Sequence, residues 1–272
     1  MPTESHPVPQ LSAPSRAFWL WAIAAVLGAG LWLHGPIAQW ADYHAFADRR
    51  SWLEIPNAAN VLSNLPFLVA GCWGSWRMRA GRVQGPGAAA WRAFGIALIC
   101  TAAGSTIYHW APSDATLVGD RLPIAWACAA LLCAFLAERV HPRRGDARAL
   151  GAALLIATLT VGYWWISESA GRGDLRPYLY LQALPMLLVP AALWLHPAPA
   201  TAPVTPARAW WAVLSLYAAA KLMEMADHLV FASTGLVSGH TLKHLLAAAG
   251  AAWLLGAATQ AGCAAINSGS RR

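Results

Sequence analysis

The chain has 272 residues, of which 58% are hydrophobic and only 11% are charged. About a quarter of the residues of an ordinary soluble domain are charged, so this composition excludes that class and indicates a membrane protein. The formal net charge of +7 could indicate a nucleic-acid partner in a soluble protein. Here the arginines follow the connections between apolar segments, and we expect no binding to nucleic acid.

The apolar residues occur in blocks of about 18 to 25 residues, the length that a helix needs to cross about 30 Å of hydrocarbon. These blocks lack the two-residue alternation of membrane strands, which favours helices. We therefore expect an all-α integral membrane protein. The sequence predicts eight helices, at 17–36, 58–78, 88–111, 121–140, 149–167, 177–196, 208–229 and 239–260. The first block has no convincing cleavage site, and we interpret it as a retained helix, not as a signal peptide.

Arginine gathers in alternate connections between these blocks, at Arg77, Arg79, Arg82 and Arg92, at Arg139, Arg143, Arg144 and Arg148, at Arg208, and at Arg271 and Arg272. The connections 112–120 and 230–238 contain no lysine or arginine. Because cytoplasmic loops are enriched in these residues, both termini are predicted to be cytoplasmic. The connections 37–57, 112–120, 168–176 and 230–238 are then external.

Ionisable side chains at membrane depth are costly, and those in this chain gather at one level. The third block ends in GSTIYHWAP, which places Ser105 and His109 four residues apart on one helical face. The fourth begins near VGDRLPIAW, with Asp120, and the eighth begins with GHTLKH, with His240 and His244 on one face. Three helices thus bring these five residues to the same external depth.

Three imidazoles are a typical ligand set of a catalytic zinc ion, which keeps a fourth position for water. We therefore predict that His109, His240 and His244 bind Zn²⁺. Asp120 is the candidate base, and Ser105 can hydrogen-bond the water or a developing oxyanion. Haem ligation is a weaker alternative, because it needs two opposed histidines and leaves the third histidine and the carboxylate unused.

Other polar residues near this level allow more than one interpretation. Glu224 and Asp227 either support the ligand histidines from behind or cap the end of their helix. Lys221 either reaches the interface or pairs with Glu224. Lys243 points away from the face of the two histidines and receives no role. The five cysteines show no CxxC spacing and are interpreted as packing residues.

Four motifs in this order resemble the alkaline ceramidases and their wider superfamily of membrane hydrolases, which includes the adiponectin-receptor group. They are NAANVLSNLPFLVAG, GSTIYHW, an Asp eleven residues after that His in GDRLPIAW, and GHTLKHLLAAAGAAWLL. The similarity covers roughly residues 45–260.

The resemblance implies a seven-helix core with a zinc ion near one membrane face and a zinc-dependent amidohydrolase activity on linear amides, of which ceramide is the type substrate. It places the zinc ligands on His109, His240 and His244, and the polar residues beside the zinc-bound water on Ser105 and Asp120. Asn60 and Asn64 match a polar motif of the first core helix. The block at 17–36 lies outside that core, so eight helices are expected in total.

Two departures from the family pattern are visible. The animal enzymes have an acidic calcium-binding segment before the first core helix, which here reads ADYHAFADRRSWLEIPN. Its acidic and amide residues, Asp42, Asp48, Glu54 and Asn57, are interrupted by Arg49 and Arg50. These arginines repel cations, so we do not expect Ca²⁺ to bind. Arg121 stands where the family has an acidic residue.

The expected organisation is a cytoplasmic tail at 1–16, an extra transmembrane helix at 17–40, a seven-helix hydrolase domain at 41–262 and a cytoplasmic tail at 263–272. We expect a multi-pass protein of a bacterial inner membrane, with its site near the periplasmic face and a membrane lipid as substrate. Ceramide or a related N-acyl lipid would give a free fatty acid and a sphingoid-type amine.

Two rival functions remain open. In a non-catalytic receptor or structural protein of the same superfamily the metal would serve stability, but a closed structural site has four ligands and no need of Ser105 and Asp120. A small-solute transporter with a proton relay predicts polar residues through to the cytoplasmic side. The cytoplasmic halves of the blocks are almost wholly apolar, which disfavours the transporter.

Overall fold

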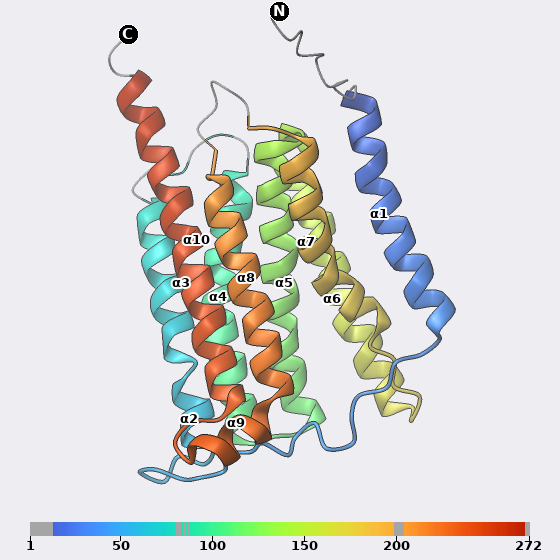
Figure 1. Cartoon of the computed structure of the whole chain (residues 1–272), viewed down its shortest axis with the longest axis vertical. Helices are drawn as coiled ribbons and strands as arrows, with labels where there is room; N and C mark the ends of the chain where they lie inside the picture. Colours follow the sequence, from blue (N-terminus) through green and yellow to red (C-terminus); the bar gives the residue numbers. More distant parts are fainter. Residues whose placement is uncertain (1–12, 80–82, 84, 86, 199–203, 270–272) are drawn as a thin grey trace, which may run out of the picture.

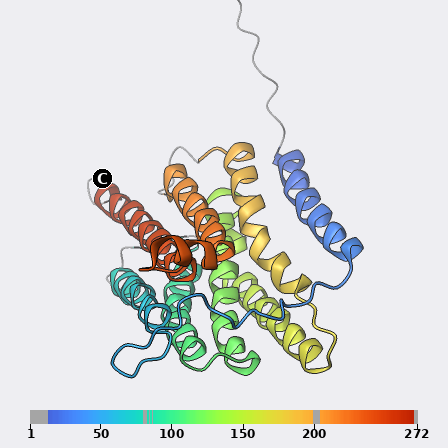
Figure 2. The ribbon, with the colours of Figure 1, turned by 60° about the horizontal axis from the view of Figure 1, so that its bottom comes forward.

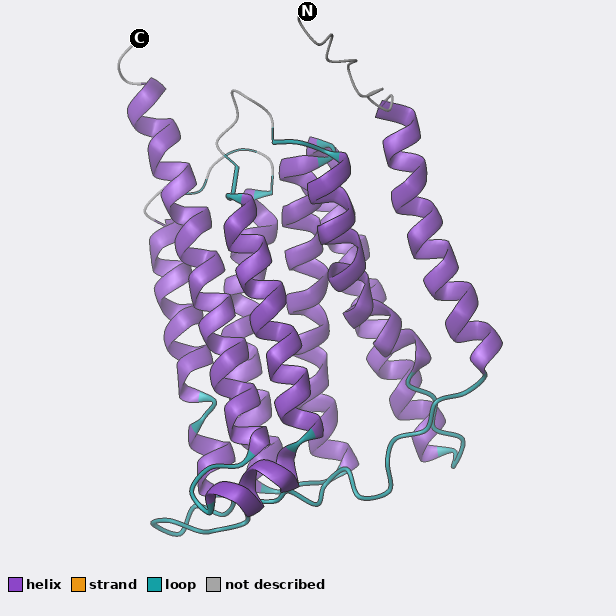
Figure 3. Cartoon of the chain, in the orientation of Figure 1, coloured by secondary structure: helices purple, strands orange, loops and turns teal. Residues whose placement is uncertain are grey.

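The computed structural model describes residues 13–79, 83, 85, 87–198 and 204–269, and in these residues the chain is helical without a named strand (Figure 1, Figure 3). Residues 1–12 of the predicted tail at 1–16, residues 270–272 of the predicted tail at 263–272, and Arg82 lie outside the described residues. The elements are α1 (Ala13–His34), α2 (Ala58–Leu62), α3 (Leu65–Arg77), α4 (Ala88–Trp110), α5 (Asp114–Arg139), the 3₁₀ turn η2 (Pro142–Gly145), α6 (Ala147–Ser169), α7 (Arg176–Leu195), α8 (Ala207–Met225), α9 (Asp227–Thr234) and α10 (Gly239–Gly269).

The helices form one bundle in which α4 packs against α3 and α5, and α10 packs against α3 and α8. The helix α1 lies at the edge and contacts α7. Only 6% of the most apolar window of α1 is buried, because its side chains face away from the bundle. The helix α1 is therefore peripheral in this bundle, while the division into an extra helix and a seven-helix domain stays a prediction.

Six helices in the described part of the chain are long and apolar enough to span a membrane, namely α1, α4, α5, α6, α7 and α10. The predicted block at 58–78 is interrupted after Leu62, and α3 has only 13 residues. The 19-residue helix α8 carries Arg208, Lys221 and Glu224. An all-helical, multi-pass membrane protein is therefore supported, whereas the count of eight spans stays a prediction.

Several boundaries predicted from the sequence are wrong by up to a few turns. The connection expected at 112–120 is mostly helix, because Ser113 and Thr116 form a reciprocal capping box that starts α5 at Asp114. The connection expected at 230–238 contains much of the short helix α9. The eighth block continues to Gly269, so that most of the segment predicted as a tail at 263–272 is helical.

Segments 35–57, 111–113 and 170–175 lie with α9 at one end of the bundle, which we call the loop end (Figure 1). Segment 35–57 crosses this end on its way from α1 to α2 (Figure 2). The start of α1 and the end of α10 lie at the opposite end. The arrangement matches the alternation of connections inferred from arginine, while the side of the membrane that each end faces stays a prediction.

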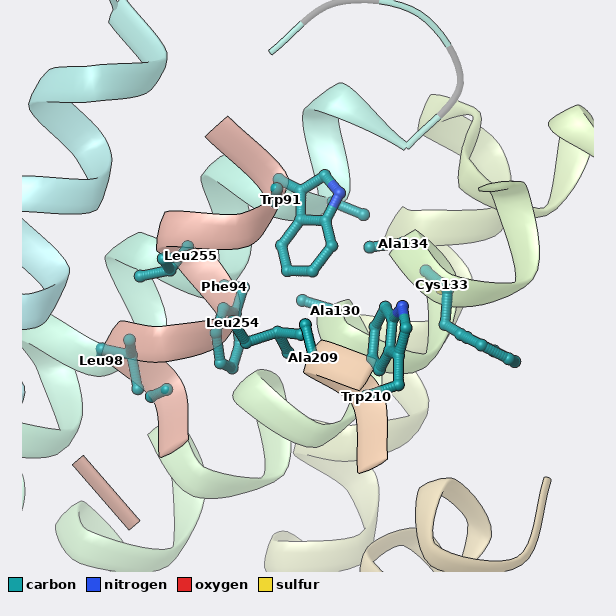
Figure 4. Packing of buried hydrophobic residues seen from close by; sticks show 14 of the residues in the cluster. Trp91, Phe94, Leu98, Ala130, Cys133, Ala134, Ala209, Trp210, Leu254 and Leu255 are labelled. Carbon is teal, nitrogen blue, oxygen red and sulfur yellow. The ribbon is translucent and has the colours of Figure 1, made fainter. Parts of the chain in front are cut away.

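The half of the bundle away from the loop end is filled by aromatic and aliphatic side chains (Figure 4). The rings of Trp91 and Trp210 lie 5.7 Å apart, and Phe135 packs edge-on against Trp210 at 4.7 Å. The indole nitrogen of Trp91 donates to Glu138 at 2.7 Å, which satisfies its one polar atom. This packed core holds α4, α5, α8 and α10 together.

Candidate metal centre

Three buried histidines meet at the loop end of the bundle. His109 lies in the last turn of α4, and His240 and His244 lie one turn apart at the start of α10. Their exposed fractions are 0%, 7% and 4%. The ring centroids form a nearly equilateral triangle with sides of 4.7, 4.9 and 4.9 Å. One ring nitrogen of each histidine lies within 4.8 Å of the others, so this triad could hold a metal ion.

The spacing of the triad fits a tetrahedral metal. The Nε2 atoms of His109 and His240 face each other at 3.2 Å. Two nitrogen ligands at about 2.0–2.1 Å from a tetrahedral zinc ion lie about 3.3 Å apart, close to that distance. Neutral imidazoles are also the donors that zinc accepts most readily. The geometry does not distinguish zinc from other metals that take nitrogen ligands.

Asp227 fixes the start of α10 and so the position of the triad. Its Oδ1 atom accepts a hydrogen bond from the backbone N–H of His240 at 2.7 Å, and its Oδ2 atom accepts one from the N–H of Ala47 at 2.9 Å. At Gly239 a Cβ atom would collide with the carbonyl oxygen of Met223, so the approach of α10 to the end of α8 requires glycine. Asp227 thus supports His240 through the backbone and not through the imidazole.

Ser105 and Asp120 lie beside the triad at the same level. Both side chains are buried, at 2% and 7% exposure, and they lie within interaction distance of each other. The Oδ1 atom of Asp120 is buried with no hydrogen-bond partner among the described residues. An unpaired buried carboxylate oxygen is uncommon and is typical of a site that acts on a ligand or water.

The Ser105–Asp120 pair depends on the close approach of α4 and α5. Gly104 and Gly119 precede the two residues, and a Cβ atom on Gly104 would collide with the carbonyl oxygen of Gly119. Only glycine lets the two backbones approach this closely. Gly104, which must be glycine here, therefore sets the distance between the helices, and the polar residues that follow Gly104 and Gly119 lie on facing turns.

We expect Gly104→Ala to lower the free energy of unfolding by about 1–3 kcal/mol or more, because the added methyl group overpacks a backbone contact that cannot relax by a rotamer change. The measurement is the thermal unfolding midpoint of the purified protein. Gly151→Ala is the matched control, since a Cβ atom there meets nothing within 4 Å. An unchanged midpoint for Gly104→Ala would show that α4 and α5 are not held together by this contact.

A polar network from α2 supports His244 and was not predicted. The Ser63 hydroxyl lies 2.7 Å from Nδ1 of His244 and donates to the carbonyl oxygen of Asn60 at 2.9 Å. The Oδ1 atom of Asn60 accepts from the Thr241 hydroxyl at 2.8 Å. The motif NVLSN signalled Asn60 and Asn64, but the role of Ser63 depends on the break between α2 and α3, which periodicity does not reveal.

Segment 41–57 covers the triad at the loop end. The ring of Phe46 packs on His109 and His240 with centroids 4.7 and 5.1 Å apart, and the Asn57 amide donates to the carbonyl oxygen of His109 at 2.9 Å. Asp48, one of the acidic residues considered for calcium, pairs with Arg50 at 2.7 Å. The hydrogen bond from Arg50 outweighs burial and lowers the pKa of the Asp48 carboxyl. Asp48 thereby helps to hold segment 41–57 in place over the triad.

Glu224 does not contact the imidazoles. It forms ion pairs with Lys221 at 2.7 Å and with Lys243 at 2.9 Å. Lys243 is 18% exposed and lines the same cavity as His244, so the expectation that it has no role at this level is wrong. Residues adjacent in a helix point in different directions, so Lys243 does not share the face of His240 and His244. Only the packing of α8 against α10 shows that Lys243 faces Glu224.

An apolar cavity of about 370 Å³ leads from this site into the bundle. Ser105, Asp120 and His244 lie at its polar end. Its walls are aliphatic and aromatic, with Leu98, Leu131, Pro185, Met186, Val213, Leu214, Trp210, Ala247 and Ala251 among the lining residues. A cavity with mostly apolar walls and a few convergent polar groups is typical of a site that binds an apolar ligand and orients one polar group of that ligand.

No model of a known protein family matches this chain, and no curated protein matches it with significance. The geometry of the site and the resemblance of its motifs therefore carry the functional argument.

Proposed function

We propose that this protein is a zinc-dependent membrane hydrolase that cleaves the amide bond of ceramide or a related N-acyl lipid. The products would be a free fatty acid and a sphingoid-type amine. One observation carries the proposal: of three buried imidazoles with metal-ligand spacing, that of His244 lines an apolar cavity together with Ser105 and Asp120. The motifs that resemble the alkaline ceramidases name the reaction class.

The side chains of the site divide the work of amide hydrolysis among them. Bound to His109, His240 and His244, zinc would supply a Lewis acid toward the carbonyl oxygen and would make water more acidic. Asp120 accepts the proton of the attacking water as the carbon–oxygen bond forms. It returns that proton to the amide nitrogen as the carbon–nitrogen bond breaks, so no net charge is left on either product fragment by the transfer. Ser105 donates a hydrogen bond to the oxygen that gains negative charge.

The location of the site at one end of the bundle suits a lipid substrate. The amide of an N-acyl lipid lies near the membrane interface, and its acyl chain extends into the hydrocarbon. A cavity that is polar at the loop end and apolar toward the bundle centre matches this distribution. We place the loop end at the periplasmic face of a bacterial inner membrane, with both termini in the cytoplasm and eight membrane-spanning helices in total.

The leading rival is a non-catalytic receptor or structural protein that holds the metal for stability. A closed structural zinc site has four protein ligands, whereas the described residues bring three imidazoles together. Glu224 and Asp227, two other carboxylates at this end of the bundle, are engaged by lysines and by backbone N–H groups. A three-ligand set with a carboxylate beside it favours catalysis.

A lipid screen tests enzyme against receptor. We expect purified protein, loaded with zinc in detergent micelles, to release fatty acid from ceramides or other N-acyl lipids, and to lose this activity when a chelator removes the metal. Fatty-acid release is measured by mass spectrometry, with boiled protein and an ester-linked lipid as controls. Stoichiometric zinc without release from any N-acyl lipid would favour the receptor.

A further inference from the structure

The cavity wall carries more positive than negative side chains. Five charged residues line it, the cations Arg121, Lys221 and Lys243 and the carboxylates Asp120 and Glu224. Both lysines pair with Glu224, at 2.7 and 2.9 Å, so one carboxylate serves two ammonium groups. Buried charges are normally matched, because an uncompensated charge in an apolar place is costly.

Arg121 is the lining cation that forms no ion pair within the described part of the chain, although its charge acts on the neighbouring Asp120. It is 3% exposed, and none of the ion pairs among the described residues includes it. Its Nε and Nη1 atoms are buried with no hydrogen-bond partner in the described part of the chain. An arginine side chain stays charged in proteins. Two unused donors on a buried guanidinium therefore point to an acceptor that comes from outside the chain.

Three aromatic rings hold the guanidinium in place. Its carbon lies 4.0 Å from the ring centroid of Trp164, 5.1 Å from that of Tyr43 and 5.4 Å from that of Tyr178. Such contacts stabilise the positive charge through the faces of the rings and leave the N–H groups at the edge of the guanidinium free. The planar arrangement of these donors suits carboxylate and phosphate oxygens, which arginine binds through two parallel hydrogen bonds.

We propose that the lipid bound in this cavity carries an anionic head group, a carboxylate or a phosphate, and that Arg121 recognises it. Lys243 lines the same cavity and shares the single carboxylate of Glu224 with Lys221, so the lining keeps an excess of positive charge. The substrate class is then an acidic N-acyl lipid, such as an N-acyl amino acid or an N-acyl amino alcohol phosphate. The identity of the substrate rests on the proposed hydrolase function, whereas the anion site itself can be tested without turnover.

Three lipids with the same acyl chain distinguish a carboxylate, a phosphate and a neutral head group. N-oleoylglycine carries a carboxylate, N-oleoylethanolamine phosphate carries a phosphate, and N-oleoylethanolamine is neutral. We expect hydrolysis of one or both anionic lipids to exceed that of the neutral lipid by about 10- to 100-fold in kcat/KM, the range expected for charge-assisted hydrogen bonds in a buried site. The better anion of the two identifies the head-group chemistry.

Arg121→Gln should bring the ratio of anionic to neutral hydrolysis close to one. This ratio of anionic to neutral hydrolysis does not change when part of the protein is inactive. Arg121→Lys keeps the positive charge but not the planar set of donors, and it should give an intermediate ratio. Arg172→Gln is the matched control, because Arg172 is an exposed arginine in the 170–175 loop and does not line the cavity. It should leave the parent ratio unchanged.

Binding separates this inference from the hydrolase proposal. Non-cleavable analogues of the glycine and ethanolamine lipids, with a methylene group in place of the amide nitrogen, are titrated into zinc-loaded protein by calorimetry. Selective binding of the anionic analogue without hydrolysis of any lipid would support the anion site and refute the hydrolase. Hydrolysis with equal binding of both analogues would support the hydrolase and refute the anion site. A parent protein that prefers the neutral lipid, or an Arg121→Gln ratio equal to the parent's, would also overturn the inference.

Discussion

His240→Ala is expected to remove the bound metal and, with it, all measurable hydrolysis. His240 is 7% exposed, and its Nε2 atom lies 3.2 Å from Nε2 of His109. Removing one of three imidazoles leaves two ligands, too few to hold zinc against water. The backbone contact of Asp227 with residue 240 survives the substitution, because it uses the N–H group and not the side chain. The start of α10 should therefore keep its position.

Metal analysis by mass spectrometry measures this directly, since the parent should contain about one zinc per chain and the variant less than about a tenth of that. His34→Ala is the matched control, because His34 is an exposed histidine at the end of α1. It should keep the metal content and the activity of the parent. Stoichiometric metal in His240→Ala would refute the ligand set, and a metal other than zinc in the parent would correct the metal but not the site.

Asp120→Asn should slow hydrolysis by about 10²- to 10⁴-fold, the usual contribution of a general base. The amide has the size of the carboxylate but cannot accept the proton of the attacking water. Because Asp120 is not one of the three proposed ligands, the metal content should stay that of the parent. The combination of a normal metal content and a large loss of rate distinguishes a base from a ligand.

Asp114→Asn is the control for this substitution. Asp114 lies on the same helix at the same end of the bundle and accepts hydrogen bonds from Gln39 at 2.8 Å and His44 at 3.1 Å, but it does not line the cavity. Its amide variant should hydrolyse near the parent rate. If Asp120→Asn is as fast as the parent, Asp120 is not the base, and the unpaired Oδ1 atom needs another explanation.

The two substitutions also separate the hydrolase from the receptor. In a receptor that uses the metal for stability, His240→Ala would lower the unfolding midpoint by removing the ligand-binding contribution of the metal, whereas Asp120→Asn would have no functional effect to measure. In the hydrolase both lose activity, but only the first loses metal. The same pair of proteins thus tests the site and the function separately.

The helices were predictable because hydropathy depends on composition alone. Blocks of apolar residues indicated helices at nearly every position where the structure has a long one, and the all-helical class follows from the backbone's need for internal hydrogen bonds in lipid. The misplaced boundaries arise from local polar groups. Ser113 caps α5 earlier than hydropathy suggests, and α9 has only eight residues, too few to be recognised as an apolar block.

Part of the site was also visible in the sequence. His240 and His244 lie on one helical face because helical geometry places residues i and i+4 together, and alternation of the helices brings the end of α4 beside the start of α10. Ser105 was found by the same four-residue spacing from His109. These inferences need only the helical repeat and the order of the helices.

The sequence by itself determined the helical class, the membrane location and the level at which the three histidines and their polar neighbours lie, because each follows from composition or from the period of a single helix. Only the tertiary structure decided that the contact of Gly104 with the backbone of α5 brings Ser105 beside Asp120, that Ser63 supports His244, and that Lys243 faces Glu224. It alone revealed that Arg121 lies among three aromatic rings and forms no ion pair with a described residue. These contacts depend on the distance and rotation between helices, which side-chain packing sets and periodicity does not encode.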